Sequence, residues 1–299
     1  MALGRIPGFL RKSWPERYQT ARFFFRQSLS KLPYFPVRVR FDVSSEEHIQ
    51  FWWSQVLPYF DEKRGLFDYW GQDVGDLRFL WRILKPGMVF MDIGAYHGIY
   101  SVVAGKKLQG NGTVVAFEPS PREYRRLRMH LRWNGISYAR AESLALGATV
   151  ARTKFFQVAS GDTTRNGLRP PDSDDSVTEI SVDTVSLDQY VASHALERVD
   201  VIKLDVEGGE IEVLRGAGAV LAKFRPVLIC EVLDATTHTW GYEAREIIAA
   251  LREQGYDWFD LNEDGSLAPH EMRSEYTRVK NYLAIPHEKC GSKGMACSG

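Results

Sequence analysis

The stretch Val89-Phe-Met-Asp92-Ile-Gly94-Ala-Tyr-His-Gly98 decides the fold class, because an apolar strand here ends in an acid and turns through two glycines into a predicted helix over 99–107. Glycine at position 94 allows the backbone to approach a ligand without an intervening Cβ atom. The following helix presents unpaired N–H groups at its positive end, where a carboxylate can bind. The turn therefore predicts a nucleotide-type cofactor site, although similar turns also occur without a ligand.

A second acid extends this predicted site. The next predicted strand ends in Glu118, 24 residues after Gly94, where an acid can accept hydrogen bonds from both hydroxyls of a ribose. A nicotinamide-binding fold has a similar outline, but its G-x-G-x-x-G spacing would need glycine in place of Tyr96 and Ile99. S-adenosylmethionine carries no phosphate that demands such a close backbone approach. The sequence therefore favours methyl transfer over hydride transfer.

Short β-branched runs alternate with amphipathic stretches beyond Pro86. The predicted strands are residues 88–93, 113–117, 199–204 and 226–232. This alternation predicts parallel βα units, and therefore an α/β fold with helices on both faces of a mostly parallel sheet. Two capping boxes, Ser120 with Glu123 and Ser186 with Gln189, predict helices over 121–133 and 187–195, and Gly208-Gly209 opens a further helix.

Three segments lie outside these units. Residues 1–71 form a predicted helical, aromatic-rich segment, with candidate helices over 16–32 and 45–57. The main domain is expected over 72–286 and begins with a third candidate helix over 73–84. Its interleaved aromatic and basic residues suit packing as a cap or homodimer contact, and less well a membrane-surface helix. Residues 148–185 predict a hairpin with a long loop, which is either a lid or a surface excursion. Residues 287–299 are expected to be a flexible tail, with no metal-ligand spacing among His287, Cys290 and Cys297.

Polar residues interrupt a strand that should be uniformly apolar. The run Val199-Asp-Val-Ile-Lys203-Leu-Asp205-Val-Glu207 is expected to be a central strand covered on both faces. Lysine and aspartate are rarely buried without partners, so these residues at a strand's carboxyl end indicate a site. The structural alternative is a buried ion pair between Lys203 and a carboxylate. The next strand ends in Glu231, so two adjacent strand ends would bring acids to one crevice.

Composition limits the partners and the compartment. The chain has 299 residues, 44% of them hydrophobic, with 38 basic and 38 acidic residues. No whole-chain field favours nucleic acid, and no uninterrupted run of about 18 apolar residues predicts a membrane span. Cys230, Cys290 and Cys297 are too few for a disulfide framework, which favours a reducing, cytoplasmic location.

Six motifs in order resemble the FkbM family of methyltransferases across roughly residues 75–260. They are Asp92-Ile-Gly-Ala95 with Gly98, Ala116-Phe-Glu-Pro119, Asn134-Gly135, Ala145-Leu-Gly147, Ile202-Lys-Leu-Asp-Val-Glu-Gly208 with Glu210, and Leu214-Arg-Gly216. The chain departs from the family's usual first turn at Tyr96 and His97. The resemblance implies a Rossmann-like class I methyltransferase fold with a seven-stranded sheet, S-adenosylmethionine as donor, and a hydroxyl acceptor on a sugar, glycan or natural product.

The resemblance also implies roles for individual residues. The methionine end of the cofactor would be lined by Asp92, Gly94, Ala95, Tyr96 and Gly98, the ribose bound by Glu118 beside Pro119, and the adenine edge met by Ser143, Leu144 and Ala145, with Asp205 close to the cofactor.

Methyl transfer to an aliphatic hydroxyl needs a base that takes the proton as the new bond forms. Asp205 is the first candidate, and Glu231 and His238 follow, with Lys203 and Glu207 beside them. Asp205, Glu231 and His238 also offer a magnesium site, which the sequence does not favour.

Three other functions stay open from the sequence. They are a nicotinamide-dependent oxidoreductase, a non-catalytic binding protein with this fold, and a nucleic-acid base methyltransferase. The last is disfavoured because the Asn-Pro-Pro-aromatic run typical of amine methylation is absent after the fourth strand, and because the net charge is zero.

Overall fold

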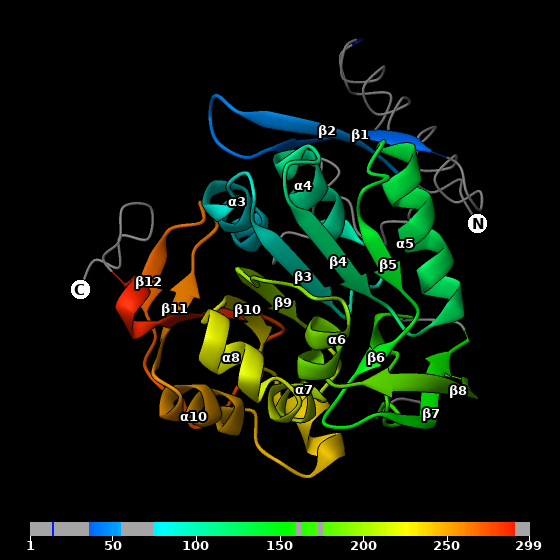
Figure 1. The fold of residues 1–299 in the computed structure, drawn as a ribbon, viewed down its shortest axis with the longest axis vertical. Helices are drawn as coiled ribbons and strands as arrows, with labels where there is room; N and C mark the ends of the chain where they lie inside the picture. The colour runs from blue at the N-terminus through cyan, green and yellow to red at the C-terminus, as the bar shows by residue number, and fades with distance from the viewer. Residues whose placement is uncertain (1–13, 15–35, 55–73, 160–162, 173–175, 291–299) are drawn as a thin grey trace.

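An eight-stranded sheet lies at the centre of the computed structural model, which describes Trp14 and residues 36–54, 74–159, 163–172 and 176–290 (Figure 1). From one edge to the other the strands are β12 (Leu267–Pro269), β11 (Tyr256–Leu261), β13 (Asn281–Pro286), β10 (Val227–Glu231), β9 (Val201–Leu204), β3 (Val89–Ile93), β4 (Thr113–Phe117) and β5 (Arg140–Glu142).

Five neighbouring strands, from β10 to β5, run parallel, whereas β13 is inserted antiparallel between β10 and β11. The predicted α/β fold with a mostly parallel sheet is confirmed. The expected number of seven strands is one too low, because β12 pairs with the free edge of β11. Every residue of β3, β9 and β10 is buried, as expected for strands that are covered on both faces.

Two groups of helices cover the two faces of the sheet (Figure 1). On one face are α3 (Val74–Ile83), α4 (Ile99–Leu108) and α5 (Pro121–Trp133), and on the other are α6 (Leu187–Ser193), α7 (Glu210–Arg215), α8 (Gly218–Phe224) and α10 (Arg245–Glu253). Alternate strand residues enter the two core layers, since Val114 packs in the first and Val115 in the second. The helix predicted over 73–84 is therefore confirmed as α3.

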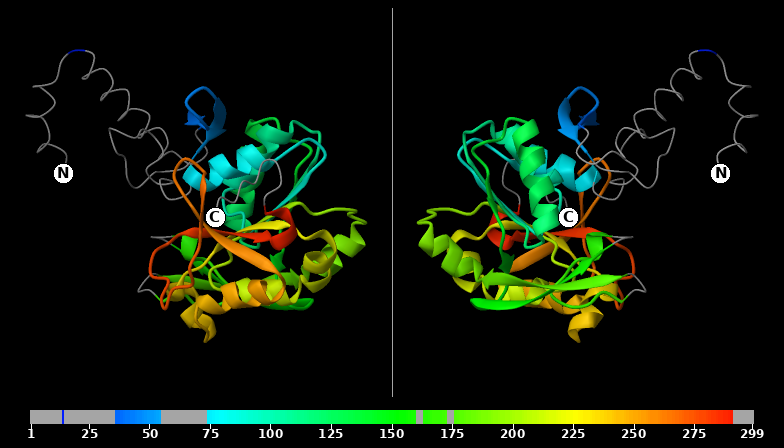
Figure 2. Two further views of the ribbon diagram at one scale, coloured as in Figure 1. Left: turned by 90° about the vertical axis from the view of Figure 1, so that its left-hand side faces the viewer. Right: turned by 90° about the vertical axis from the view of Figure 1, so that its right-hand side faces the viewer.

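The helix expected over 45–57 is wrong. The chain forms a hairpin of β1 (Val37–Asp42) and β2 (His48–Trp53), at the top of the views in Figures 1 and 2. Burial in β2 alternates strictly, with Ile49, Phe51 and Trp53 inside, so the hydrophobic period is that of a strand. Residues 55–57 and the helix expected over 16–32 lie outside the described residues.

The predicted hairpin within 148–185 is confirmed. Every residue of β7 (Ala151–Val158) pairs with β8 (Val177–Val185), and β6 (Ala145–Leu146) adds to β8 to make a separate three-stranded sheet. Between β7 and β8 lies the short 3-10 helix η2 (Thr163–Arg165), and Gly167 forms a bridge back to Phe156. This bridge folds the described part of the loop onto the hairpin.

Helix α5 has the predicted bounds, but the capping box at its start is not formed. The Ser120 N–H donates to Glu118 Oε1 at 2.8 Å, so it is not available to Glu123. The Ser120 hydroxyl donates to the Glu123 carboxylate instead of capping the helix. The second box is confirmed in part, because Ser186 Oγ accepts from the Gln189 N–H at 3.2 Å.

Residues 287–290 are anchored, unlike the tail expected there. His287 Nδ1 lies 2.7 Å from Asp257 Oδ2, and Glu288 accepts a 2.9 Å hydrogen bond from Arg225. Residues 291–299, with Cys297, lie outside the described part of the chain. No helix among the described residues is long and apolar enough to cross a bilayer.

Candidate active site

The turn after β3 packs tightly against the end of β9. Gly94 has a φ of +80°, and a Cβ atom at this position would lie 1.7 Å from the carbonyl oxygen of Asp205. Gly98 has a φ of +84°, and its Cβ would lie 2.4 Å from a methyl carbon of Leu127. From the sequence, glycine at position 94 was explained by the close approach of a ligand to the backbone. The structure adds a second reason, because the turn could not lie this close to β9 and α5 with larger residues.

Glu118 is hydrogen-bonded to this turn. The sequence predicted that the glycine turn and Glu118 belong to one site. Its carboxylate accepts the Tyr96 N–H on Oε2 and the Ser120 N–H on Oε1, both at 2.8 Å. The side chain is buried, and burial raises the pKa of Glu118 to about 8. Each carboxylate oxygen can accept two hydrogen bonds, so both retain capacity for a further donor such as a hydroxyl.

Asp92 joins β3 to the first turn of α4. Its Oδ2 accepts from the Ser101 hydroxyl at 2.5 Å and from the Ser101 N–H at 3.0 Å. Burial raises the pKa of Asp92 to about 6, although these bonds and the Lys203 charge oppose the shift. The carboxylate thus fixes the helix that begins at the glycine turn, a role that the sequence did not reveal.

The residues expected at the adenine edge directly follow Glu142, a backbone partner of Glu118. The Glu118 N–H donates to the Glu142 carbonyl at 3.0 Å, so the segment after β5 begins at the same rim. Along this segment Ser143 is exposed, Leu144 is half-buried and Ala145 is buried at the start of β6. Pro119, directly after Glu118, is half-buried.

Lys203 and Asp205 form an ion pair at the carboxyl end of β9. The Lys203 ammonium lies 2.7 Å from Asp205 Oδ2 and 5.1 Å from the centre of the Tyr100 ring. The lysine side chain is 1% exposed, whereas that of Asp205 is 33% exposed. The structural reading of Lys203 as half of a buried pair is therefore correct, and its partner Asp205 stays partly exposed.

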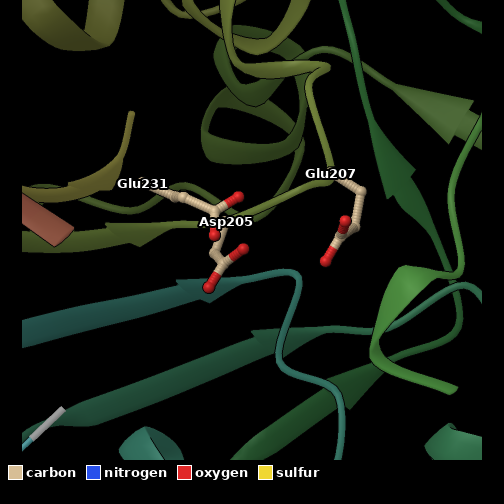
Figure 3. A group of neighbouring side chains, drawn as sticks. All are labelled: Asp205, Glu207 and Glu231. Carbon is tan, nitrogen blue, oxygen red and sulfur yellow. The ribbon is translucent and has the colours of Figure 1, made fainter. Parts of the chain in front are cut away.

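Three carboxylates converge next to this pair. Asp205, Glu207 and Glu231 each place a carboxylate oxygen within 4.8 Å of the others (Figure 3). Glu231 is 6% exposed, and burial together with the charges of Asp205 and Glu207 raises its pKa well above the usual range. Glu210 lies behind them, where burial raises its pKa to about 7. Two adjacent strand ends thus deliver acids to one place, as predicted.

His238 does not join this group. It begins the 3-10 helix η3 (His238–Trp240) after α9 (Asp234–Thr237), its side chain is 64% exposed, and its Nε2 lies 4.0 Å from Asp234 Oδ1. Of the unfavoured set Asp205, Glu231 and His238, the structure therefore brings only Asp205 and Glu231 together, and Glu207 is the third member of the group that it shows. The short helix turns the His238 ring toward Asp234.

Residues that the sequence did not single out surround Glu207. Trp240 Nε1 donates to the Glu207 carbonyl at 3.2 Å, and the Tyr242 hydroxyl donates to the Gly208 carbonyl at 2.5 Å. Arg169 stacks over the Trp240 ring at 4.7 Å, and Gly167 lies against the Glu207 side chain. The described part of the loop between β7 and β8 therefore lies against the Glu207 side chain. The adjacent aromatic residues at 240 and 242 were the available signal.

Comparison with known proteins gives a consistent result. The family model described as "Methyltransferase FkbM domain" matches residues 92–258, more than half of the chain. Similar proteins include AMB antimetabolite synthetase AmbE of Pseudomonas aeruginosa, 28% identical over 72% of this chain and 12% of that protein. Hexuronic acid methyltransferase AglP of Haloferax volcanii is 27% identical, over 53% of this chain and 61% of that protein. The match thus spans less than two thirds of either relative.

A third relative is aligned over more of its own length. The 31-O-demethyl-FK506 methyltransferase FkbM of Streptomyces tacrolimicus is 27% identical, over 58% of this chain and 74% of that protein.

Proposed function

Because the chain belongs to the FkbM methyltransferase family, we propose that it transfers a methyl group from S-adenosylmethionine to a hydroxyl oxygen of a sugar or another natural product. Two relatives support this acceptor class by name, since one is a hexuronic acid methyltransferase and the other a 31-O-demethyl-FK506 methyltransferase. Membership of a methyltransferase family also sets aside the nicotinamide-dependent oxidoreductase considered from the sequence.

One arrangement carries the proposal. The turn after β3 lies between two acids, with Gly94 against the backbone of Asp205 and the Tyr96 N–H bonded to Glu118. A cofactor held by Glu118 and an acceptor held by Asp205 would therefore meet at this turn. Such a meeting converts the reaction into an effectively unimolecular step, which is the main contribution a protein makes to an in-line displacement.

The residues at the rim of the sheet fit S-adenosylmethionine. We assign the ribose hydroxyls to the Glu118 carboxylate, which has two hydrogen bonds from backbone N–H groups and capacity for more. To the methionine end we assign Asp92, Gly94, Ala95, Tyr96 and Gly98, and to the adenosine side Pro119, Ser143, Leu144 and Ala145. When bound, the cofactor supplies an electrophilic methyl group on a positively charged sulfur.

We assign the proton-accepting role to Asp205. Lys203 binds Oδ2 of this side chain at 2.7 Å, so Oδ1 is the oxygen that faces an acceptor hydroxyl. A third of the Asp205 side chain is exposed, which gives the acceptor access. A positioned base of this kind contributes about 10²- to 10⁴-fold to the rate. Glu207, covered by the β7–β8 loop, and Glu231 line the acceptor side.

A screen of acceptors with methyl-labelled S-adenosylmethionine tests the proposal. The panel contains free uronic acids, hexose glycosides and hydroxylated macrocycles, and the product is mapped by mass spectrometry. We expect labelled methyl ether on at least one class, and loss of the label with Asp205→Asn. Binding of S-adenosylhomocysteine without transfer to any hydroxyl, or transfer to nitrogen, would contradict the proposal.

A further inference from the structure

We propose that Asp205, Glu207 and Glu231 form a binding site for one divalent hard cation, Mg²⁺ or Mn²⁺. The three residues come from two adjacent strand ends and the loop between β9 and α7. In Figure 3 the Glu207 side chain extends from that loop toward Asp205, and Glu231 reaches Asp205 from the end of β10. Their oxygens lie within 4.8 Å of one another, a spread that one cation with ligands at about 2.0 to 2.6 Å can draw together.

The environment of Glu231 favours a bound ligand between the three carboxylates. Its side chain is 6% exposed, and within the described residues its Oε2 is buried with no hydrogen-bond partner. A buried polar atom without a partner costs about 1 to 3 kcal/mol, and more when it is charged. Native proteins seldom leave such an atom unsatisfied. A cation between the three carboxylates would coordinate this oxygen.

The local charge matches a divalent ion. Cation binding displaces any proton from its ligands, so in the bound state the three carboxylates carry three negative charges. Lys203, bound to Asp205 Oδ2, compensates one of them. Two charges remain for the cation. Arg169, one of the basic residues on the covering loop, stacks over Trp240.

The chemistry of the ligands selects the ion. An all-oxygen set of carboxylates suits Mg²⁺, Mn²⁺ or Ca²⁺ and gives no advantage to zinc or copper, which prefer imidazole and thiolate. Mg²⁺ keeps several waters when bound by carboxylates, and neighbouring oxygens of a sugar can replace them. In that role, which rests on the proposed function, the cation would hold the acceptor and lower the pKa of its hydroxyl. Binding of the cation itself does not depend on methyl transfer.

Mn²⁺ titration of the metal-stripped full chain tests the site, with electron paramagnetic resonance detecting the free ion. We expect one Mn²⁺ per chain, displaced by Mg²⁺, and affinity at least about tenfold weaker in Glu231→Gln, since loss of even an outer-shell group costs that much. Glu207→Gln should have the same effect, and it is the second variant because Glu207 is only half-buried. Glu212→Gln, a partly exposed carboxylate on α7, is the matched control and should bind Mn²⁺ like the wild type.

Two results would overturn the site. One is wild-type protein that binds S-adenosylhomocysteine but no Mn²⁺, which leaves the proposed function intact. The other is equal Mn²⁺ affinity in the wild type, Glu231→Gln and Glu207→Gln. A protein that binds Mn²⁺ at this site but neither S-adenosylhomocysteine nor S-adenosylmethionine would support the cation site and contradict the proposed function.

Discussion

Gly94 packs against the backbone of Asp205 so closely that a Cβ atom at position 94 would lie 1.7 Å from the Asp205 carbonyl oxygen. The Asp205 N–H in turn donates to the Ile93 carbonyl at 3.0 Å. These contacts join the glycine turn to the acid that follows β9. Two motifs separated by more than a hundred residues therefore form one rigid rim.

Gly94→Ala should disrupt this rim. The substitution adds a methyl group where backbone already lies, and it places a non-glycine residue at a φ of +80°, which alone costs about 1 to 2 kcal/mol. We expect a loss of stability well above that value, measured by urea denaturation, and loss of S-adenosylhomocysteine binding. Gly135→Ala is the control, because its φ is +72° and nothing lies within 4 Å of its added Cβ. Equal stability of the two variants would show that the turn is free to move.

Asp205→Asn should separate chemistry from cofactor binding. Asparagine keeps the size of the side chain and can still accept the Lys203 hydrogen bond, but it cannot take a proton. Turnover should fall by about 10²- to 10⁴-fold while affinity for S-adenosylhomocysteine changes little. Asp183→Asn, on the exposed hairpin, should behave as the wild type. Full activity of Asp205→Asn would assign the base to another group.

Lys203→Met should destabilise the fold. The lysine side chain is 1% exposed, and its removal leaves the Asp205 carboxylate without its ion-pair partner. Breaking a buried pair costs about 3 to 5 kcal/mol, and we expect the low end because Asp205 is partly exposed. The double variant with Asp205→Asn should lose less than the sum of the single changes in urea denaturation. Strict additivity would mean that the pair contributes nothing.

Protonation of His130 should lower the free energy of unfolding in acid. Its Nδ1–H donates to the His97 carbonyl at 2.8 Å and its Nε2 accepts the Ser54 N–H at 3.1 Å, so the ring must be neutral. Burial lowers the pKa of His130 from about 6.5 to about 4. As the pH falls, His130 is therefore protonated in the unfolded chain before it is protonated in the folded one. The contribution of the neutral ring to the free energy of unfolding is complete above pH 6.5 and is lost as the pH falls toward 4. The slope is at most about 1.4 kcal/mol per pH unit.

His130→Gln is the matched variant, because an amide can donate to one backbone group and accept from the other without titrating. The wild type should be the more stable protein at pH 7.5, and its advantage in free energy of unfolding should shrink at pH 4.5. Comparing the two proteins cancels the carboxylates that titrate over the same range. An advantage of the same size at both pH values would exclude His130 as the titrating group.

The central strands could be predicted because their hydrophobic runs and the residues that end them are local features. The hairpin at β2 was predicted as a helix although Ile49, Phe51 and Trp53 alternate at strand spacing, and the contacts that β2 makes with α5 are distant in the sequence. Asn134 accepts the Trp52 N–H and donates to the Trp52 carbonyl, each at 2.9 Å, across 82 residues of chain. Trp53 stacks on the His130 ring at 3.7 Å. These tertiary contacts select a strand where the sequence suggested a helix.

The convergence of the acids could be predicted because each of them lies at the end of a recognisable strand. Parallel strands end at one edge of a sheet, so Asp205 and Glu231 were expected to converge. The direction of His238 depends on a short helix after β10, and the cover over Glu207 depends on how the β7–β8 loop folds back through Gly167. The direction of His238 and the fold of the loop have no local signature, so the cation set that the sequence offered but did not favour contained His238 and not Glu207. Arg169 and Trp240 were not identified, although the aromatic residues at 240 and 242 were a signal in the sequence.

Calorimetric titration of S-adenosylhomocysteine into the wild type and Glu118→Gln tests the central claim most directly, with NADH as the competing ligand and the exposed Glu179→Gln as the control. Above the Glu118 pKa of about 8 the carboxylate is ionised. A hydrogen bond to a charged group contributes about 1.5 to 3 kcal/mol, so at about pH 9 the account predicts binding that weakens by about ten- to a hundredfold in Glu118→Gln alone, and no binding of NADH. Equal affinity in all three proteins, or binding of NADH in place of S-adenosylhomocysteine, would contradict it.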